Sequence, residues 1–402
     1  MNEIRQKSDI VRCDPWQNEP ESRRTCMLLI SLSCNLNCTY CYEEFKCDKK
    51  MSFEIAKDII LKECEIVKSD PKFKGLEIDL MGGEPMTNFP LIKQLVEWAR
   101  VLPLPVPYIF FMTTNGTLIG EAEKAWFRTN ADVICASVSY DGSEDMQQAN
   151  RGVAVTSVDY NFFHVTWPFQ PFHVTISKQS LPYLAVNIIE MHKKGWELNA
   201  ALASGIDWND DDVMELMRQL KSLHTFYLEN PNYKPINLLT HPLFIRNHTI
   251  ASQAKQEKFC GCGVYMQTYD VDGKAYGCHM FTPIVLGERA FEASTVDWKC
   301  DDAVIDPFCD TCVLKRVCHT CPGFNYKYRG SLAIRDHGAC RMILAEMKAA
   351  AMFQLDYLSS NRQTLLPRDV MYAKALVEAL PVLNGIDMEV AEAPFIDKTG
   401  EG

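Results

Sequence analysis

Short apolar runs alternate with longer runs of helical periodicity between residues 25 and 225. In the longer runs apolar residues recur at i, i+3 and i+4, the spacing of one face of an amphipathic helix. The short runs predict strands at Cys26–Ser33, Leu76–Met81, Tyr108–Thr113, Val133–Tyr140, Phe172–Ser177 and Leu198–Leu202, and the long runs predict helices at Ser52–Lys68, Leu91–Val101, Gly120–Thr129, Ser143–Asn150, Leu181–Lys194 and Asp210–Tyr227. Six strand-then-helix units predict an α/β fold with a parallel sheet covered by helices. Periodicity does not distinguish an open sheet from a closed one, but either form places functional residues at the C-terminal ends of the strands.

The alternation stops at about residue 234. Residues 255–340 are rich in cysteine, glycine and turn residues and have too few apolar residues for a conventional core, so we expect metal binding to support their folding. Two more helices are predicted, at Arg341–Leu358 and Arg368–Leu380. The predicted division of the chain is an N-terminal extension (1–24), an α/β domain (25–234), a cysteine-rich domain (235–358), and a C-terminal helix and tail (359–402).

Composition excludes some classes of protein. The chain has 402 residues, with 41 Lys or Arg and 52 Asp or Glu, and a formal net charge of −11. This acidic balance argues against a main role in binding nucleic acid or anionic lipid. The uncharged stretch 101–120 is interrupted by Pro103, Pro105 and Pro107, so no membrane span is expected. An odd cysteine count and the lack of an apolar signal segment at the start predict reduced thiols and a cytoplasmic protein.

The cysteines are clustered along the chain. Eleven of the 17 fall in three groups, which are Cys34, Cys38 and Cys41; then Cys260, Cys262 and Cys278; then Cys309, Cys312, Cys318, Cys321 and Cys340. Clusters of this kind indicate thiolate ligation of zinc or iron–sulfur groups. The six scattered cysteines, Cys13, Cys26, Cys47, Cys64, Cys135 and Cys300, are expected to serve as small hydrophobic residues.

The first group has the spacing C-x3-C-x2-C in Cys34-Asn-Leu-Asn-Cys38-Thr-Tyr-Cys41-Tyr42, directly after the first predicted strand. Three cysteines that hold a 4Fe–4S cube leave its fourth iron open to a non-protein ligand. The alternative is half of a zinc site, but structural zinc takes four protein ligands and no fourth is nearby. This motif, with Tyr40 before its last cysteine, resembles that of the radical S-adenosylmethionine (SAM) enzymes.

The resemblance continues at the ends of the next three strands. Met81-Gly82-Gly83-Glu84-Pro85 is similar to the family's GGEP motif, which accepts hydrogen bonds from the SAM amino group. Thr113-Thr114-Asn115-Gly116 corresponds to relatives whose Asn lies near the SAM ribose. Ser139 and Arg151 correspond to a Ser and an Arg that hold the SAM carboxylate.

This resemblance implies a fold and a reaction. The fold is a partial (β/α)6 TIM-like barrel over residues 25–234, followed by a C-terminal Cys-rich iron–sulfur domain. In the reaction, an electron from the reduced cluster cleaves SAM to a 5′-deoxyadenosyl radical, which removes a hydrogen atom from the substrate. The electron is expected to come from a flavodoxin or a ferredoxin.

The later cysteines resemble the SPASM extension of radical SAM enzymes, which holds two auxiliary 4Fe–4S clusters and so brings the implied total to three. The resemblance assigns Cys309, Cys312, Cys318 and Cys340 to the outer cluster, and Cys262, Cys278 and Cys321 to the inner one, with Cys260 as its fourth ligand. The family pattern has C-x3-C where this chain has Cys318-His-Thr-Cys321, so Cys321 departs from it by one residue. Two zinc knuckles are the alternative, since zinc and iron share thiolate ligands.

SPASM relatives act on peptides or proteins. One group forms thioether or carbon–carbon crosslinks in ribosomally made peptides, and another oxidises Cys or Ser of sulfatases to formylglycine. In the second group an Asp that serves as the base follows the inner cysteine, and here that position is His279, which is either a catalytic base or a hydrogen-bond partner near the cluster. We therefore expect a peptide maturase, most simply one that forms a thioether. An iron–sulfur electron carrier is the alternative of another class.

The expected partners follow from the same resemblance. They are a peptide or small-protein substrate and the electron donor. The residues before the first predicted strand are too few for a leader-binding domain, so we expect a leader peptide to be recognised by a separate protein or by another surface.

Overall fold

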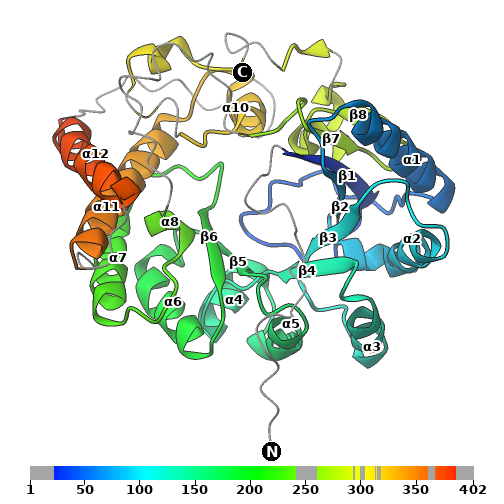
Figure 1. The fold of residues 1–402 in the computed structure, drawn as a ribbon, viewed down its shortest axis with the longest axis horizontal. Coiled ribbons are helices and arrows are strands. Elements are labelled where there is room, and N and C mark those ends of the chain that lie inside the picture. The colour runs from blue at the N-terminus through cyan, green and yellow to red at the C-terminus, as the bar shows by residue number, and fades with distance from the viewer. Residues whose placement is uncertain are drawn as a thin grey trace, which may run out of the picture.

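Six parallel strands form an arc whose outer face is covered by helices (Figure 1). The computed structural model describes residues 22–240, 260–292, 295–298, 304–312, 314, 318–360 and 367–385. The strands of the arc are β1 (Arg23–Ser31), β2 (Gly75–Gly82), β3 (Tyr108–Thr114), β4 (Ile134–Val138), β5 (Phe172–Ile176) and β6 (Leu198–Leu202). β1 to β4 pair in sequence order, and β5 pairs with β6. The predicted α/β fold with a parallel, barrel-like sheet is confirmed.

Helices follow the strands as the periodicity predicts. They are α1 (Phe53–Ser69), α2 (Phe89–Val101), α3 (Glu121–Asn130), α4 (Glu144–Arg151), α5 (Tyr160–Thr166), α6 (Leu184–Lys193), α7 (Asp210–Glu229) and α8 (Asn237–Thr240). Short 3-10 turns occupy Pro85–Asn88, Val155–Ser157, Leu181–Tyr183, His279–Phe281, Gly287–Arg289 and Pro307–Thr311. α1 begins where Ser52 Oγ accepts the backbone N–H of Ile55, as expected for an N-cap. α5 was not predicted, because a seven-residue helix is too short to show a period.

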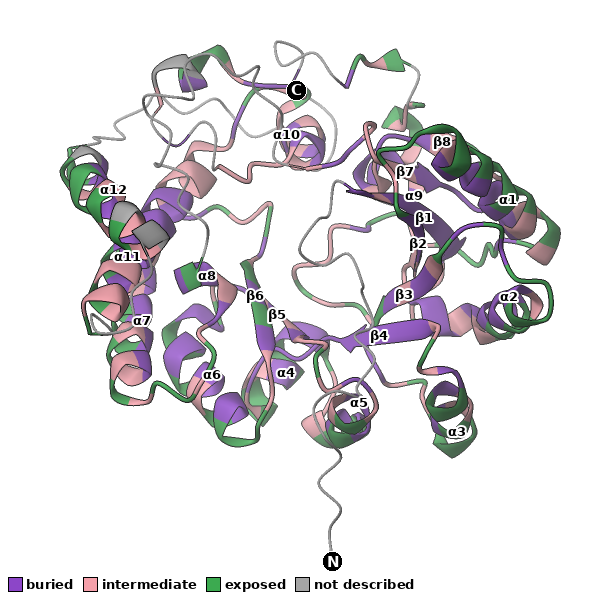
Figure 2. Ribbon diagram, in the orientation of Figure 1, coloured by how far each residue is buried: buried purple, intermediate pink, exposed green. Residues whose placement is uncertain are grey.

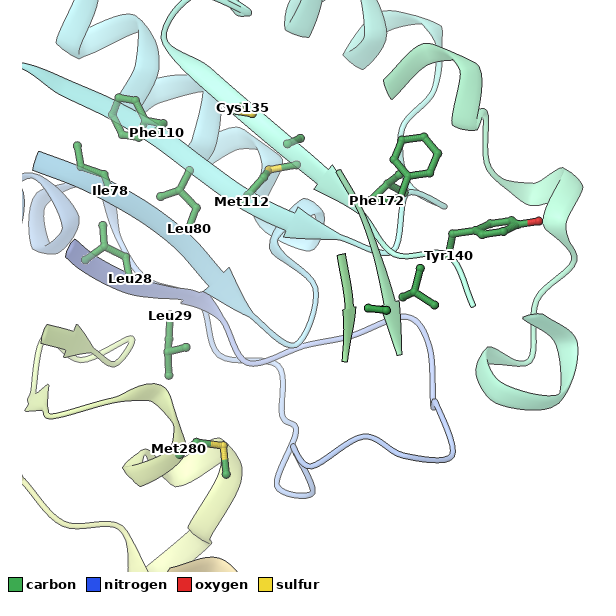
Figure 3. Close-up of a cluster of buried hydrophobic side chains, with 14 of the residues drawn as sticks. Leu28, Leu29, Ile78, Leu80, Phe110, Met112, Cys135, Tyr140, Phe172 and Met280 are labelled. Atoms are coloured by element: carbon green, nitrogen blue, oxygen red, sulfur yellow. The ribbon is translucent and has the colours of Figure 1, made fainter. Parts of the chain in front are cut away.

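The strands have two faces of different character. Leu76, Ile78 and Leu80 of β2 are fully buried beneath the helices. They lie beside Leu28, Phe110 and Met112 of the neighbouring strands (Figure 3). Because successive side chains of a strand point to opposite faces, Glu77, Asp79 and Met81 face the interior of the arc. Figure 2 shows β1 to β4 mostly buried, β6 partly exposed, and the outer faces of the helices exposed.

β4 ends earlier than predicted, and the reason lies in the sheet. Ser139, which was predicted to be within the strand, still donates its N–H to the Thr114 carbonyl of β3 at 3.0 Å but lies past the paired residues, and it forms an isolated bridge with His173 of β5. This bridge joins the four-strand part of the arc to the β5–β6 pair. The point where the sheet divides is therefore the end of β4.

The cysteine-rich part of the chain packs on both ends of the arc. β7 (Met266–Tyr269) runs parallel to β1, and β8 (Ala275–Tyr276) pairs antiparallel with β7. The remaining helices are α9 (Pro283–Leu286), α10 (Pro322–Arg329), α11 (His337–Ser360) and α12 (Pro367–Asn384), and α11 packs against α7, α8 and α12. Both predicted C-terminal helices are present, and α11 begins earlier because the Asp336 carboxylate accepts the N–H of Ala339. Most of the predicted extension 1–24 and the tail beyond 385 lie outside the described residues. Within the described helices, none combines the length and the apolar character that a bilayer span requires.

Candidate functional site

A cavity of about 350 Å³ lies at the C-terminal ends of the strands. Its wall combines the loop after β1 with the ends of β2, β3, β4 and β5. All ten residues predicted for the first cluster and for SAM line it, and these are Cys34, Cys38, Tyr40, Cys41, Gly82, Gly83, Glu84, Asn115, Ser139 and Arg151. Residues up to 117 positions apart in the chain thus share one chamber, of a size that suits a small organic ligand.

The loop that carries Cys34, Cys38 and Cys41 is fastened to two other segments. The backbone N–H of Thr39 donates to the carbonyl of Asn150 at 2.9 Å. Asn115 Nδ2 donates to Asn35 Oδ1 at 3.0 Å, so the end of β3 holds the loop as well. The three thiols are free and half-buried, and burial raises the pKa of Cys34 to about 11.

Gly82 and Gly83 let the end of β2 approach this loop closely. The N–H of Gly83 donates to the Ser31 carbonyl at 3.1 Å. Gly82 has φ +143°, and a Cβ there would lie 1.9 Å from the same carbonyl oxygen. Only glycine fits such a position, because an L side chain would meet both an unfavourable φ and a backbone clash.

The Glu84 carboxylate connects the ends of β2 and β3. It is 2% exposed and accepts hydrogen bonds from Met86 N, Thr114 Oγ1 and Asn115 N at 3.0, 2.7 and 2.8 Å. Burial raises its pKa, and these hydrogen bonds act in the opposite direction. Two of the bonds reach Oε1 and one reaches Oε2, so Oε2 keeps a lone pair for a further donor.

Arg151 enters the cavity already paired with Asp141, a residue absent from the predicted site. Arg151 Nε and Nη2 donate to Asp141 Oδ2 and Oδ1 at 3.0 and 3.2 Å. Tyr40 Oη also donates to Asp141 Oδ2, at 2.5 Å. Burial opposes the charge of Arg151, but Asp141 outweighs it and raises the Arg151 pKa. A guanidinium has five donors, so this pairing fixes its orientation and leaves others for a ligand.

The remaining eight cysteines of the predicted clusters gather in two further places. Burial and the neighbouring thiols of Cys318, Cys309 and Cys312 raise the pKa of Cys340 to about 12. Cys278 is in hydrogen-bond contact with Cys262. Burial and the thiols of Cys278 and Cys260 raise the pKa of Cys321 to about 12, so Cys321 lies with the inner set. In the part of the chain that the structure describes, no three His, Cys, Asp or Glu side chains are placed as ligands of a single metal ion. The ligand roles are therefore stated below as proposals.

His279 lies between the inner cysteines and the first loop, and it is not part of the cavity wall. Its Nε2 is 3.1 Å from Tyr42 Oη, and its Nδ1 is 3.4 Å from Cys278 Sγ. Burial would lower the pKa of His279, but the neighbouring Cys278 outweighs it and raises the pKa to about 9.

Three charged residues of the wall were missed at the sequence level, namely Glu43, Lys46 and Asp79. Lys46 Nζ donates to Cys41 Sγ at 3.1 Å. Burial raises the pKa of Glu43 to about 7 and that of Asp79 to about 8. The alternation of apolar and acidic residues in Leu76–Met81 is a signal that could have found Asp79, since it predicts a strand with one polar, inward face.

Comparison with known proteins agrees with this arrangement. The family model described as "4Fe-4S single cluster domain" matches residues 22–157, the part that includes the first cysteine group and Arg151. A curated relative, the uncharacterized protein MJ0907 of Methanocaldococcus jannaschii, is 27% identical over 247 residues, which cover 58% of this chain and 77% of that protein.

Solved structures share the architecture. Native anSMEcpe with bound AdoMet has a TM-score of 0.61 at 15% identity, covering 85% of this chain and 100% of that chain. The same protein with AdoMet and the Kp18Cys peptide has a TM-score of 0.61 at 15% identity, covering 85% and 99%. Streptococcus suis SuiB bound to its precursor peptide SuiA has a TM-score of 0.54 at 14% identity, covering 79% and 76%. The predicted resemblance is thus confirmed at the level of the fold.

Proposed function

We propose that this protein is a radical SAM enzyme that modifies a peptide or a small protein. The observation that carries the proposal is the shared cavity, where three free thiols, the Gly82-Gly83-Glu84 turn, Asn115, Ser139 and Arg151 meet. An electron carrier of another class needs no such chamber beside its cluster.

The residues present fit a three-thiol cluster. Cys34, Cys38 and Cys41 open on the cavity from one loop, and the described wall offers no fourth cysteine. When bound there, a 4Fe–4S group supplies the electron that cleaves SAM to the 5′-deoxyadenosyl radical. Cys260, Cys262, Cys278 and Cys321 would hold the inner auxiliary cluster, and Cys309, Cys312, Cys318 and Cys340 the outer one.

The chain's own residues would bind and orient SAM. The free lone pair of Glu84 Oε2 can accept from an amino group, and the unpaired donors of Arg151 can hold a carboxylate, with Ser139 beside them. Asp141 and Tyr40 keep the guanidinium in place before SAM arrives, which lowers the cost of ordering it on binding.

A peptide substrate is supported by the neighbours, since anSMEcpe and SuiB were solved with peptides bound. We propose thioether formation as the reaction, with a flavodoxin or ferredoxin as electron donor, a separate leader-binding protein, and the cytoplasm as the location. Formylglycine formation is the second candidate, favoured by the similarity to anSMEcpe. Carbon–carbon crosslinking is a third outcome of the same assay.

The test is an anaerobic assay of the iron-reconstituted, dithionite-reduced protein with SAM. Wild-type protein is expected to release 5′-deoxyadenosine, measured by liquid chromatography, and the triple variant C34A/C38A/C41A to release none. The product is then sought by mass spectrometry on Cys-containing peptides encoded beside the gene, where a loss of two hydrogens with a blocked thiol indicates a thioether. Formylglycine in a sulfatase peptide would replace the thioether proposal, and a wild type with full iron content that yields no 5′-deoxyadenosine would refute the enzyme proposal.

A further inference from the structure

Among the described residues, each of the three cysteine groups has a basic side chain against one of its sulfur atoms. Lys46 Nζ donates to Cys41 Sγ at 3.1 Å, and Arg335 Nη1 donates to Cys318 Sγ at 3.2 Å. His279 Nδ1 lies 3.4 Å from Cys278 Sγ. These side chains come from three separate segments: the loop after β1, the turn before α11 and the turn after β8. The cysteine spacings themselves require none of them.

Lys46 directs its charge at the first group. Burial acts against the charge, but the hydrogen bond to Cys41 outweighs it, and the pKa of Lys46 is raised. Arg151 is a second cation near Cys38, but Asp141 already balances its charge. Lys46 is thus the cation whose hydrogen bond goes to sulfur at this group.

At the outer group, the cation that hydrogen-bonds to a cysteine sulfur is a buried arginine, Arg335. Its side chain is 4% exposed and donates to Cys318 Sγ and Thr320 Oγ1. Its Nε, also buried, has no hydrogen-bond partner among the described residues. A buried guanidinium stays charged and is unfavourable without negative charge nearby. The Asp306 carboxylate accepts the backbone N–H of Arg335 at 3.1 Å rather than a guanidinium N–H. Four thiolates on an iron–sulfur cube would place negative charge at the guanidinium itself, which four neutral thiols do not, so Arg335 fits a loaded site.

His279 completes the pattern at the inner group. One ring nitrogen faces Cys278 and the other faces Tyr42 Oη, so both nitrogens are engaged within the protein. This arrangement suits a hydrogen-bond donor to sulfur, because a base acting on a substrate needs a ring nitrogen that the substrate can reach.

We propose that Lys46, Arg335 and His279 set the reduction potentials of three iron–sulfur groups, each through an N–H···S hydrogen bond to one cysteine ligand. The inference rests on the proposed function only in requiring iron–sulfur groups at the three cysteine sets, and it needs neither SAM cleavage nor a peptide. A hydrogen bond or a positive charge at a ligand sulfur stabilises the reduced, more negative form, so each residue raises the potential of its own group.

Redox titration followed by electron paramagnetic resonance tests this on the full, iron-reconstituted chain. At a fixed potential, Lys46→Met is expected to lower the reduced-to-oxidised ratio about tenfold for the signal that SAM perturbs, a shift of about 59 mV for a one-electron couple. Lys46→Arg keeps a charged donor and is expected to stay near wild type. Arg335→Met should shift a different signal, Arg335→Lys should restore it, and His279→Phe should shift the third.

If each variant shifts the signal of its own iron–sulfur group only, its residue sets that reduction potential. A shift of all three signals would instead indicate a general disturbance of the protein. If Lys46→Met holds full iron and titrates like wild type, or if every variant moves all three signals equally, the proposal is wrong. Weaker SAM binding with an unchanged potential would assign Lys46 to SAM binding instead and would also overturn it. If Arg335→Met does not fold, the comparison of Lys46→Met with Lys46→Arg is sufficient to test the proposal. Lys46 is only half-buried, so we expect both of its variants to fold. Separate shifts in a protein that releases no 5′-deoxyadenosine would support this inference while refuting the enzyme proposal.

Discussion

At the residue scale, the glycines of the cavity wall make the sharpest stability prediction. Gly82→Ala places a Cβ against the Ser31 carbonyl oxygen at a positive φ, and backbone cannot move aside as a flexible side chain can. We expect the free energy of unfolding to fall by more than about 3 kcal/mol, because backbone strain and steric overlap both contribute. Urea unfolding of the apoprotein measures it. Gly152→Ala is the matched control, because Gly152 also has a positive φ but no atom within 4 Å of the added Cβ, and it should lose about 1 to 2 kcal/mol.

The buried Arg151–Asp141 pair predicts a second difference. Arg151 is only 7% exposed, and Asp141→Asn removes the negative charge that its guanidinium pairs with. We expect the free energy of unfolding to fall by about 3 to 5 kcal/mol. Glu215→Gln, which removes the pair with the exposed Arg218, should cost much less, because solvent screens that pair. Equal losses in the two variants, measured by urea unfolding, would contradict the buried pairing.

At the element scale, the contact between α6 and α7 predicts a pH dependence. His192 Nδ1 lies 3.2 Å from the Trp196 carbonyl oxygen, which can only accept, so Nδ1 carries the hydrogen and Nε2 accepts from Tyr227 Oη at 2.7 Å. Burial lowers the pKa of His192. The unfolded chain therefore binds a proton that the folded chain resists, and stability falls as pH drops below about 6.5.

The measurement is the urea midpoint at pH 7.5 and at pH 5.5. The part of the decrease that belongs to His192 is expected to disappear in His192→Gln, whose amide can still bond without titrating. A variant with the same slope as wild type would show that other groups cause the decrease.

The elements that the sequence predicted well are those with strong periodicity. The six strands and the helices between them, α5 excepted, appear where the alternation places them, because each buries one apolar face in the same core. The cysteine-rich segment shows no such period, so β7, β8 and α10 were not predicted. At the site, motif residues were found, but Asp141, Lys46 and Arg335 were not. Their partners lie only 5 to 17 residues away in the chain, but loops without a period do not indicate which side chains face each other.

The scattered cysteines also show what the sequence could and could not predict. Cys26, Cys64 and Cys135 are buried in the main core, as expected of small hydrophobic residues, while Cys47 is exposed. Cys13 and Cys300 lie outside the described residues. Composition predicted the common outcome for an isolated cysteine and could not identify the exception.

At the scale of the whole molecule, a buried cation joins the cysteine-rich part to the arc. Lys327 of α10 donates to the carbonyls of Tyr42 and Val285 at 2.9 and 3.0 Å and pairs with Glu44 at 3.2 Å. Burial lowers its pKa. Lys327→Met keeps the stem but removes these bonds, and we expect a loss of about 2 to 4 kcal/mol in urea unfolding, because two carbonyls remain buried without donors.

Lys274→Met is the control, since Lys274 pairs with Glu292 on the surface and should lose under about 1 kcal/mol. A loss at Lys327→Met no larger than this control would mean that the α10 contact does not hold the two parts together.

The narrow joint between β4 and β5 has a mechanical consequence. Ser139 and His173, the two residues of the single bridge, both line the cavity, so a molecule bound there touches both halves of the barrel. A ligand there would therefore connect the two parts of the sheet, and we expect it to restrain the β5–β6 pair. Amide hydrogen exchange in β5 and β6 should slow when SAM binds, while exchange in β2, already secured on both sides, should change little.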